Sequence, residues 1–72
     1  MKNLEIFAQR VKELRKQQRL SQAELGDVLG LTHKSISTIE SGIRGTTIEK
    51  LIVLAKFFDV STDYLLGLKD EP

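Results

Sequence analysis

The fold is decided by residues 20–42, which read LSQAELGDVLGLTHKSISTIESG. Ser21 and Glu24 have the spacing of a capping box, in which the serine hydroxyl accepts from the backbone and the glutamate reaches back to the start of a helix. Gly30 can end that helix, because glycine adopts the left-handed conformation without steric cost. Thr32 can then cap a second helix. The pattern predicts two short helices joined by a glycine turn, as in a helix-turn-helix unit.

The second of these helices carries few apolar residues. Ile36 and Ile39 are its two inward positions, so its other faces hold histidine, lysine, serine and threonine. A helical hairpin also occurs in purely structural bundles, but a buried hairpin does not leave so polar a helix. A helix that lies in the DNA major groove needs exposed hydrogen-bond donors and acceptors. The composition of this helix therefore favours DNA binding.

Hydrophobic periodicity predicts three more helices, and no stretch alternates with the period of a strand. The first helix has an apolar stripe formed by Leu4, Phe7, Val11 and Leu14. The fourth is the most apolar and is expected at the centre of the core, with inward positions at Ile48, Leu51, Ile52, Leu54, Ala55 and Phe58. Thr46 or Thr47 caps it, Asp59 lies at or past its end, and Ser61 caps a fifth. The predicted helices span residues 3–18, 21–29, 32–41, 47–58 and 61–66.

Length and composition exclude several classes of protein. A chain of 72 residues has room for one domain, residues 1–72, and the prediction is an all-α, compact five-helix bundle with a frayed tail at residues 69–72. Without cysteine there is no disulfide, thiolate zinc site or cysteine nucleophile, which favours an intracellular protein. The longest apolar run, residues 51–55, is far short of the roughly 20 residues that span a membrane.

No catalytic or metal-binding arrangement is evident in the sequence. His33 is the one histidine, and neither Ser35 nor Ser37 has a carboxylate at a spacing that would complete a catalytic group with it. We therefore expect no enzyme activity, no metal, no cofactor and no small-molecule ligand.

The net charge of +1 is unevenly distributed. Residues 1–20 hold six Lys and Arg against two Glu, a charge of +4, which leaves −3 for the remainder. This distribution fits either an ordinary solvated helix face or a surface for an anionic partner.

The chain resembles the Cro/repressor-type, xenobiotic-response-element-like helix-turn-helix DNA-binding domains. The resemblance covers nearly the whole chain and is carried by residues 11–15, 20–25, 30–32, 35–37, 39–42, 51, 54–55 and 60–66. It implies a lambda-repressor-like fold and sequence-specific binding to double-stranded DNA, usually as a symmetric dimer on a pseudo-palindromic operator. It also implies a transcriptional regulator, most simply a repressor, in bacterial or phage-infected cytoplasm and at the nucleoid when bound.

The resemblance assigns roles to individual positions. The base-reading positions fall on His33, Lys34, Ser37 and Thr38. The phosphate-contacting positions fall on Arg10, Ser21, Gln22, Ser35 and Arg44, and Gln22 is also expected to steady His33. Arg15 and Glu40 match a largely buried ion pair between the first and third helices. The sequence departs from the family at Arg19 and Thr46, where relatives often have glycine and proline, and at Gly26, where they have alanine.

Two expectations concern partners. A homodimer is expected through apolar residues near the C-terminus, namely Phe58, Val60, Tyr64, Leu65 and Leu68. The alternative function is a protein-interaction module of the same fold, which predicts an exposed apolar patch and no salt-sensitive affinity for DNA. Gln22, Lys34 and Arg44, together with the basic first helix, favour DNA.

Overall fold

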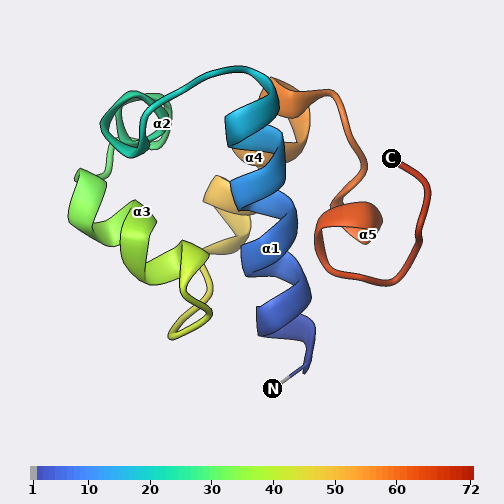
Figure 1. The fold of residues 1–72 in the computed structure, drawn as a ribbon. Helices are drawn as coiled ribbons and strands as arrows, with labels where there is room; N and C mark the ends of the chain where they lie inside the picture. The colour runs from blue at the N-terminus through green and yellow to red at the C-terminus, as the bar shows by residue number, and fades with distance from the viewer. Residues whose placement is uncertain (1) are drawn as a thin grey trace.

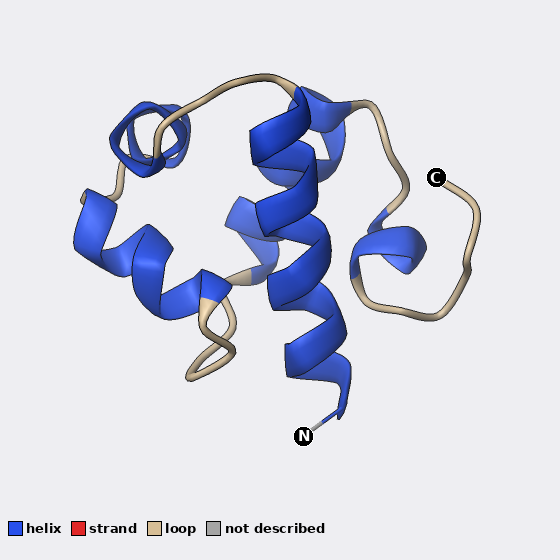
Figure 2. Ribbon diagram, viewed as in Figure 1, coloured by secondary structure: helices blue, strands red, loops and turns tan. Residues whose placement is uncertain are grey.

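The computed structural model describes residues 2–72 as five helices around one apolar core (Figure 1). The helices are α1 (Lys2–Gln17), α2 (Gln22–Leu29), α3 (His33–Glu40), α4 (Ile48–Phe58) and α5 (Thr62–Leu65). Residues 2–72 contain helices and loops and no strand (Figure 2), which confirms the predicted all-α fold. The observed helix ends differ from the predicted ones by at most one residue. Met1, part of the predicted domain, lies outside the described residues.

Four helices begin at a capping hydroxyl. The side chain accepts from a backbone N–H three residues on, and the capping residues are Ser21, Thr32, Thr47 and Ser61. Such a cap typically contributes about 1 kcal/mol, because it satisfies a helix N–H that has no partner within the helix. The sequence analysis gave Thr46 and Thr47 as alternative N-caps of α4, and in the structure the N-cap is Thr47.

Left-handed residues end several helices. Gly30 ends α2 with φ 69°, and Asp59 ends α4 with φ 55°. Arg19, where relatives often have glycine, has φ 57° in the turn after α1. A non-glycine residue in this conformation costs about 1 kcal/mol, so this turn is formed against a local steric preference.

The core is built from all five helices. Its buried side chains are Phe7, Val11, Leu25, Leu29, Ile36, Ile39, Leu54, Ala55, Phe58 and Leu65. The prediction that α4 also turns Ile48 and Ile52 inward is wrong, because both are exposed. Successive helix residues rotate by about 100°, so a side centred on Leu54 and Phe58 leaves Ile48 and Ile52 outside it.

The C-terminal segment is tied back to the domain. Figure 1 shows α1 in the middle, with α2 and α3 on one side and α5 and the C-terminal segment on the other. Arg10 donates to Lys69 O at 2.7 Å, and Ser61 N donates to Pro72 O at 2.9 Å. The predicted fraying of residues 69–72 is therefore corrected, because two hydrogen bonds from distant residues hold this segment.

None of the helices in the described part of the chain has the length and hydropathy needed to cross a lipid bilayer.

Candidate nucleic-acid interface

α2 and α3 are joined by a tight turn. Gly26 O accepts from the backbone N–H of Gly30, which closes α2, and from that of Leu31 at 2.8 Å. A Cβ atom on Gly26 would lie 2.4 Å from Leu31 O. From the sequence, glycine in place of alanine at position 26 is expected to keep a close helix contact and to lose up to about 1 kcal/mol of helix propensity. The structure adds that this close approach of backbone to backbone leaves no room for a side chain.

α3 turns its polar side away from the core. Ile36 and Ile39 are buried, while the exposed side carries His33, Lys34 and Ser37. Neither the Lys34 ammonium nor the His33 ring makes a hydrogen bond within residues 2–72. These polar groups at the start of α3 are therefore available to a partner.

Three hydroxyls of this region are engaged locally. Thr38 Oγ1 donates to Lys34 O at 2.9 Å. Thr32 Oγ1 accepts from Ser35 N and lies 3.2 Å from Ser35 Oγ. Since the Thr38 proton is used within the helix, this residue can offer a base an acceptor oxygen or its methyl group. If Thr38 contacts a base as predicted, it therefore accepts a hydrogen bond or packs its methyl group against a thymine methyl.

A side chain from the loop after α3 reaches back to the first turn of that helix. Arg44, in the segment between α3 and α4, donates from Nη2 to Ser35 Oγ at 3.4 Å and is exposed. Ser35 itself is half-buried. The structure thus brings together two of the positions expected to contact phosphate, one on α3 and one on the loop.

A largely buried ion pair ties α1 to the end of α3. Arg15 Nε donates to Glu40 Oε2 at 2.7 Å, and Arg15 Nη2 donates to Glu40 Oε1 at 3.0 Å. Arg15 Nη1 also donates to Leu20 O at 2.8 Å, in the connection between α1 and α2. The hydrogen bond to Glu40 raises the pKa of Arg15 above its ordinary value, so the guanidinium stays charged throughout the accessible pH range.

Gln22 joins this pair. Its Nε2 donates to Glu40 Oε1 at 3.3 Å, and the residue is half-buried in the first turn of α2. The family resemblance implied that Gln22 steadies His33. In the structure its hydrogen bond is instead to Glu40, at the other end of α3. This link was missed because no local pattern connects residues 18 positions apart. One amide proton of Gln22 remains for a phosphate.

Ser21 and Glu24 form the predicted capping box. Ser21 N donates to Glu24 Oε1 at 2.8 Å, and Glu24 N donates to Ser21 Oγ at 3.0 Å. The backbone hydrogen bond lowers the pKa of Glu24. Because the Ser21 oxygen acts as an acceptor, its exposed O–H can still donate to a phosphate.

Arg10 is engaged on a different side of the molecule. Its Nη1 donates to Tyr64 O and Lys69 O, and its guanidinium lies over the Tyr64 ring, 4.2 Å from the ring centroid. Nη2 lies 3.4 Å from Asp70 Oδ1. Because both terminal nitrogens of Arg10 bond to α5 and the C-terminal segment, we leave Arg10 out of the phosphate contacts proposed below. No short-range signal predicts this arrangement, since the partners lie more than 50 residues away.

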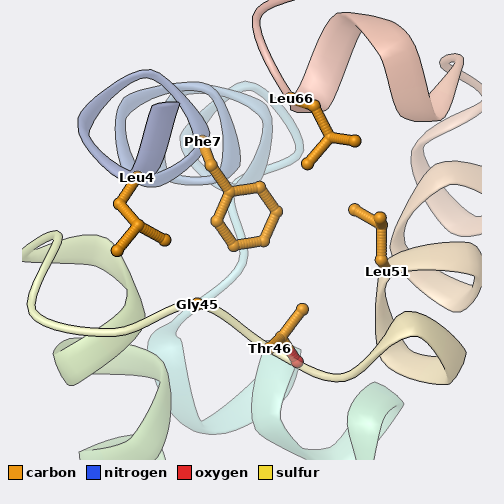
Figure 3. A pocket seen from close by; sticks show the side chains of 6 residues that line it. All are labelled: Leu4, Phe7, Gly45, Thr46, Leu51 and Leu66. Carbon is orange, nitrogen blue, oxygen red and sulfur yellow. The ribbon is translucent and has the colours of Figure 1, made fainter. Parts of the chain in front are cut away.

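A shallow apolar pocket lies between α1, α4 and α5. Its volume is about 140 Å³, and its lining is Leu4, Phe7, Gly45, Thr46, Leu51 and Leu66. Figure 3 shows the Phe7 ring between the three leucines, with the Gly45–Thr46 backbone along one side. The lining has no ionisable side chain. Within the described residues, no three His, Asp or Glu side chains gather in a way that could hold a metal ion.

The chain matches a family model described as Helix-turn-helix over residues 11–65. It is 36% identical over 67 residues to the uncharacterized HTH-type transcriptional regulator YobD of Bacillus subtilis, covering 93% of this chain and 60% of that protein. It is 39% identical over 70 residues to the control protein C.SmaI of Serratia marcescens, covering 93% of this chain and 83% of that protein.

A solved structure has the same arrangement of helices. It is the P22 c2 repressor protein in complex with a synthetic operator, with a TM-score of 0.81 and 32% sequence identity over 88% of this chain and 96% of that one. Because the likeness covers most of both chains at this TM-score, the lambda-repressor-like fold expected from the sequence is confirmed.

Proposed function

Because the chain belongs to the helix-turn-helix family, we propose that it binds double-stranded DNA in a sequence-specific manner and regulates transcription, acting as a repressor in the cytoplasm at the nucleoid. One observation carries the proposal: the second helix of the helix-turn-helix buries Ile36 and Ile39 and leaves His33 and Lys34 exposed without partners in the described part of the chain. Such a helix presents donors and acceptors to the major groove. The likeness to a repressor solved with operator DNA supports the same reading.

The proposed contacts divide by chemistry. Lys34, near the start of α3, reaches a base edge, with guanine O6 and N7 as the matching acceptors. Neighbouring base contacts come from His33, Ser37 and Thr38. Phosphates are held by Ser21, Gln22, Ser35 and Arg44, which fix the orientation of the domain without reading sequence.

We propose that two copies bind a pseudo-palindromic site. Two recognition helices related by a two-fold axis then meet successive major grooves about 34 Å apart. The dimer surface expected from the sequence needs revision, since Phe58 and Leu65 are buried in this chain's own core and Tyr64 lies under Arg10. Of the expected residues, Leu68 is exposed and stays a proposed contact, and the exposed apolar side chains Ile48 and Ile52 are added to it.

Ile52→Glu tests the dimer. The charge would have to be buried between the two copies, so affinity for a duplex with two half-sites should fall about tenfold or more. Affinity for a duplex with one half-site should not change. Footprinting that shows one half-site protected at saturation would contradict the two-fold arrangement.

Selection from a random duplex library tests the function itself. We expect the bound fragments to converge on a sequence with two related half-sites, and affinity for it to fall with rising salt. A second candidate, a protein-interaction module, is favoured by the exposed apolar residues of α4, namely Ile48, Ile52, Val53 and Phe57. If no fragment is enriched and no salt-sensitive binding is measured, the interaction module is supported and DNA binding is rejected.

A further inference from the structure

An exposed leucine lies just after α5. Leu68 is 65% exposed and belongs to the C-terminal strap, residues 67–72. In Figure 1 the strap lies on the same side of α1 as α5, away from α2 and α3. Removing such an apolar side chain from water by contact with a partner is favourable.

The backbone at Leu68 is fixed from two directions. Leu68 N donates to Asp63 O at 2.8 Å, and Gly67 N donates to Tyr64 O at 3.1 Å. Gly67 has φ 78°, and a Cβ atom built on it would lie 2.8 Å from Ile6 Cγ2 on α1. The strap is therefore attached to α5 and passes close against α1 at its first residue.

Arg10 holds the strap on the other side of this leucine. The Arg10 side chain is 17% exposed. Its Nη1 donates to Tyr64 O and to Lys69 O, and its Nη2 donates to Asp70 Oδ1 at 3.4 Å. A guanidinium is suited to this role because it offers five donors in a rigid plane. One side chain of α1 thus bonds the chain both before and after Leu68.

The proposed dimer contacts are few. A stable protein–protein interface buries about 800 Å² per partner, drawn from about 20 to 30 residues. Ile48, Ile52 and Leu68 supply only a small part of such an interface. Their contact is weak in free solution and forms when DNA holds two copies close together. A contact residue that is already ordered then binds better, because no segment has to be ordered on association.

We propose that Arg10 is a positioning residue, which fixes the strap so that Leu68 is presented to the second copy of this chain on DNA. This inference rests on the proposed two-fold binding to DNA. Arg10 itself contacts neither the DNA nor the second copy. The residue expected from the family resemblance to hold a phosphate therefore affects DNA binding through assembly of the two copies.

The test compares a duplex with two half-sites and a duplex with one, both taken from the sequence that the unmodified protein selects. Arg10→Ala should weaken binding to the two-site duplex about tenfold, the cost of fixing the backbone of one residue. Binding to the one-site duplex should change less than about twofold, since it needs no second copy. Lys12→Ala is the matched control, because Lys12 is an exposed cation on the same helix. If the two variants weaken both duplexes alike, lost charge explains the effect and the proposal is overturned.

Gly67→Ala perturbs the strap without changing Arg10. The alanine Cβ meets Ile6 and φ 78° is strained for alanine, so the strap shifts. This variant should also weaken binding to the two-site duplex and spare the one-site duplex. An unchanged affinity for the two-site duplex would overturn the proposal.

A double substitution tests whether Arg10 acts through Leu68. Leu68→Ser removes the contact itself and should weaken binding to the two-site duplex at least as much as Arg10→Ala does. Adding Arg10→Ala to Leu68→Ser should cause no further loss, because the two residues then belong to one interaction. Losses that add, or no loss in Leu68→Ser, would overturn the proposal.

Amide hydrogen exchange measures the order of the strap directly. In Arg10→Ala the amides of Leu68 and Ser61, which donate to Asp63 O and Pro72 O, should exchange faster, while the amides of α3 stay as protected as before. Unchanged exchange would show that Arg10 does not fix the strap. Faster exchange throughout the domain would make Arg10 a general stabilising residue. Either result would overturn the proposal.

Two further outcomes separate the explanations. If Arg10→Ala weakens binding to the one-site duplex and lowers the salt slope by about one, Arg10 holds a phosphate and the proposal fails. If the unmodified protein prefers no duplex over random DNA, the proposed function itself fails, whatever the Arg10 variants do.

Discussion

Arg15 and Glu40 are joined by two hydrogen bonds, from Nε to Oε2 at 2.7 Å and from Nη2 to Oε1 at 3.0 Å. The Arg15 and Glu40 side chains are 11% and 3% exposed. The same carboxylate accepts from Gln22. The Glu40 carboxylate at the end of α3 therefore links this helix to α1 and to the first turn of α2.

Truncating the carboxylate should destabilise the domain strongly. In Glu40→Ala the Arg15 charge loses its partner while it stays largely buried, which typically costs about 3 to 5 kcal/mol. Urea unfolding measures this loss. Glu13→Ala is the control, because Glu13 is an exposed glutamate whose side chain, among the described residues, accepts a hydrogen bond from Gln9 alone. A loss below about 0.5 kcal/mol for Glu40→Ala would contradict a buried, stabilising pair.

Gly26→Ala should destabilise the domain even though alanine is the better helix former. Alanine gains up to about 1 kcal/mol in helix propensity. Its Cβ, however, would lie 2.4 Å from Leu31 O, so the turn must shift at a cost of about 1 to 3 kcal/mol. We therefore expect a net loss in urea unfolding. Ala23→Gly, at an exposed position of the same helix, measures the propensity contribution separately. A Gly26→Ala variant more stable than the unmodified protein would show that the turn relaxes freely.

The capping box of α2 should give a defined pH dependence. The pKa of Glu24 is lowered in the folded protein by the hydrogen bond from Ser21 N. The stability from this bond is thus fully present above the pKa of an unfolded glutamate, about 4.3, and is lost as pH falls through the lower folded value. The difference in unfolding free energy between the unmodified protein and Glu24→Gln should shrink between about pH 6 and about pH 3. An unchanged difference would mean that Glu24 does not cap the helix.

Local patterns account for most of the fold. Ser21, Thr32 and Ser61 were predicted as caps from their own neighbourhoods, and Gly30 as the end of α2, because caps and left-handed residues depend on interactions within one turn. Periodicity alone predicted the burial of Ile36 and Ile39. The same method failed at Ile48 and Ile52, since the width of the buried side of α4 depends on the helices packed against it.

Local patterns could not predict contacts between residues that are distant in the sequence. Arg10 has the basic character of a phosphate contact, but its partners are Tyr64, Lys69 and Asp70, and only the packing of α5 against α1 brings them together. The same holds for Phe58 and Leu65, whose apolar character fits a dimer surface and a core equally well. Lys34 is the opposite case, because polarity on a helix with two inward positions already predicted that it would be exposed.

The most direct test of the account measures DNA affinity against salt concentration for Lys34→Ala and Arg44→Ala, on the selected duplex and on a scrambled one. If Lys34 reads a base, Lys34→Ala loses about 1 to 3 kcal/mol on the selected duplex and little on the scrambled one. Arg44→Ala, which removes a phosphate contact, weakens both duplexes and lowers the salt slope by about one. If Lys34→Ala instead weakens both duplexes equally, Lys34 contacts a phosphate, and the assignment of the reading face of α3 is wrong.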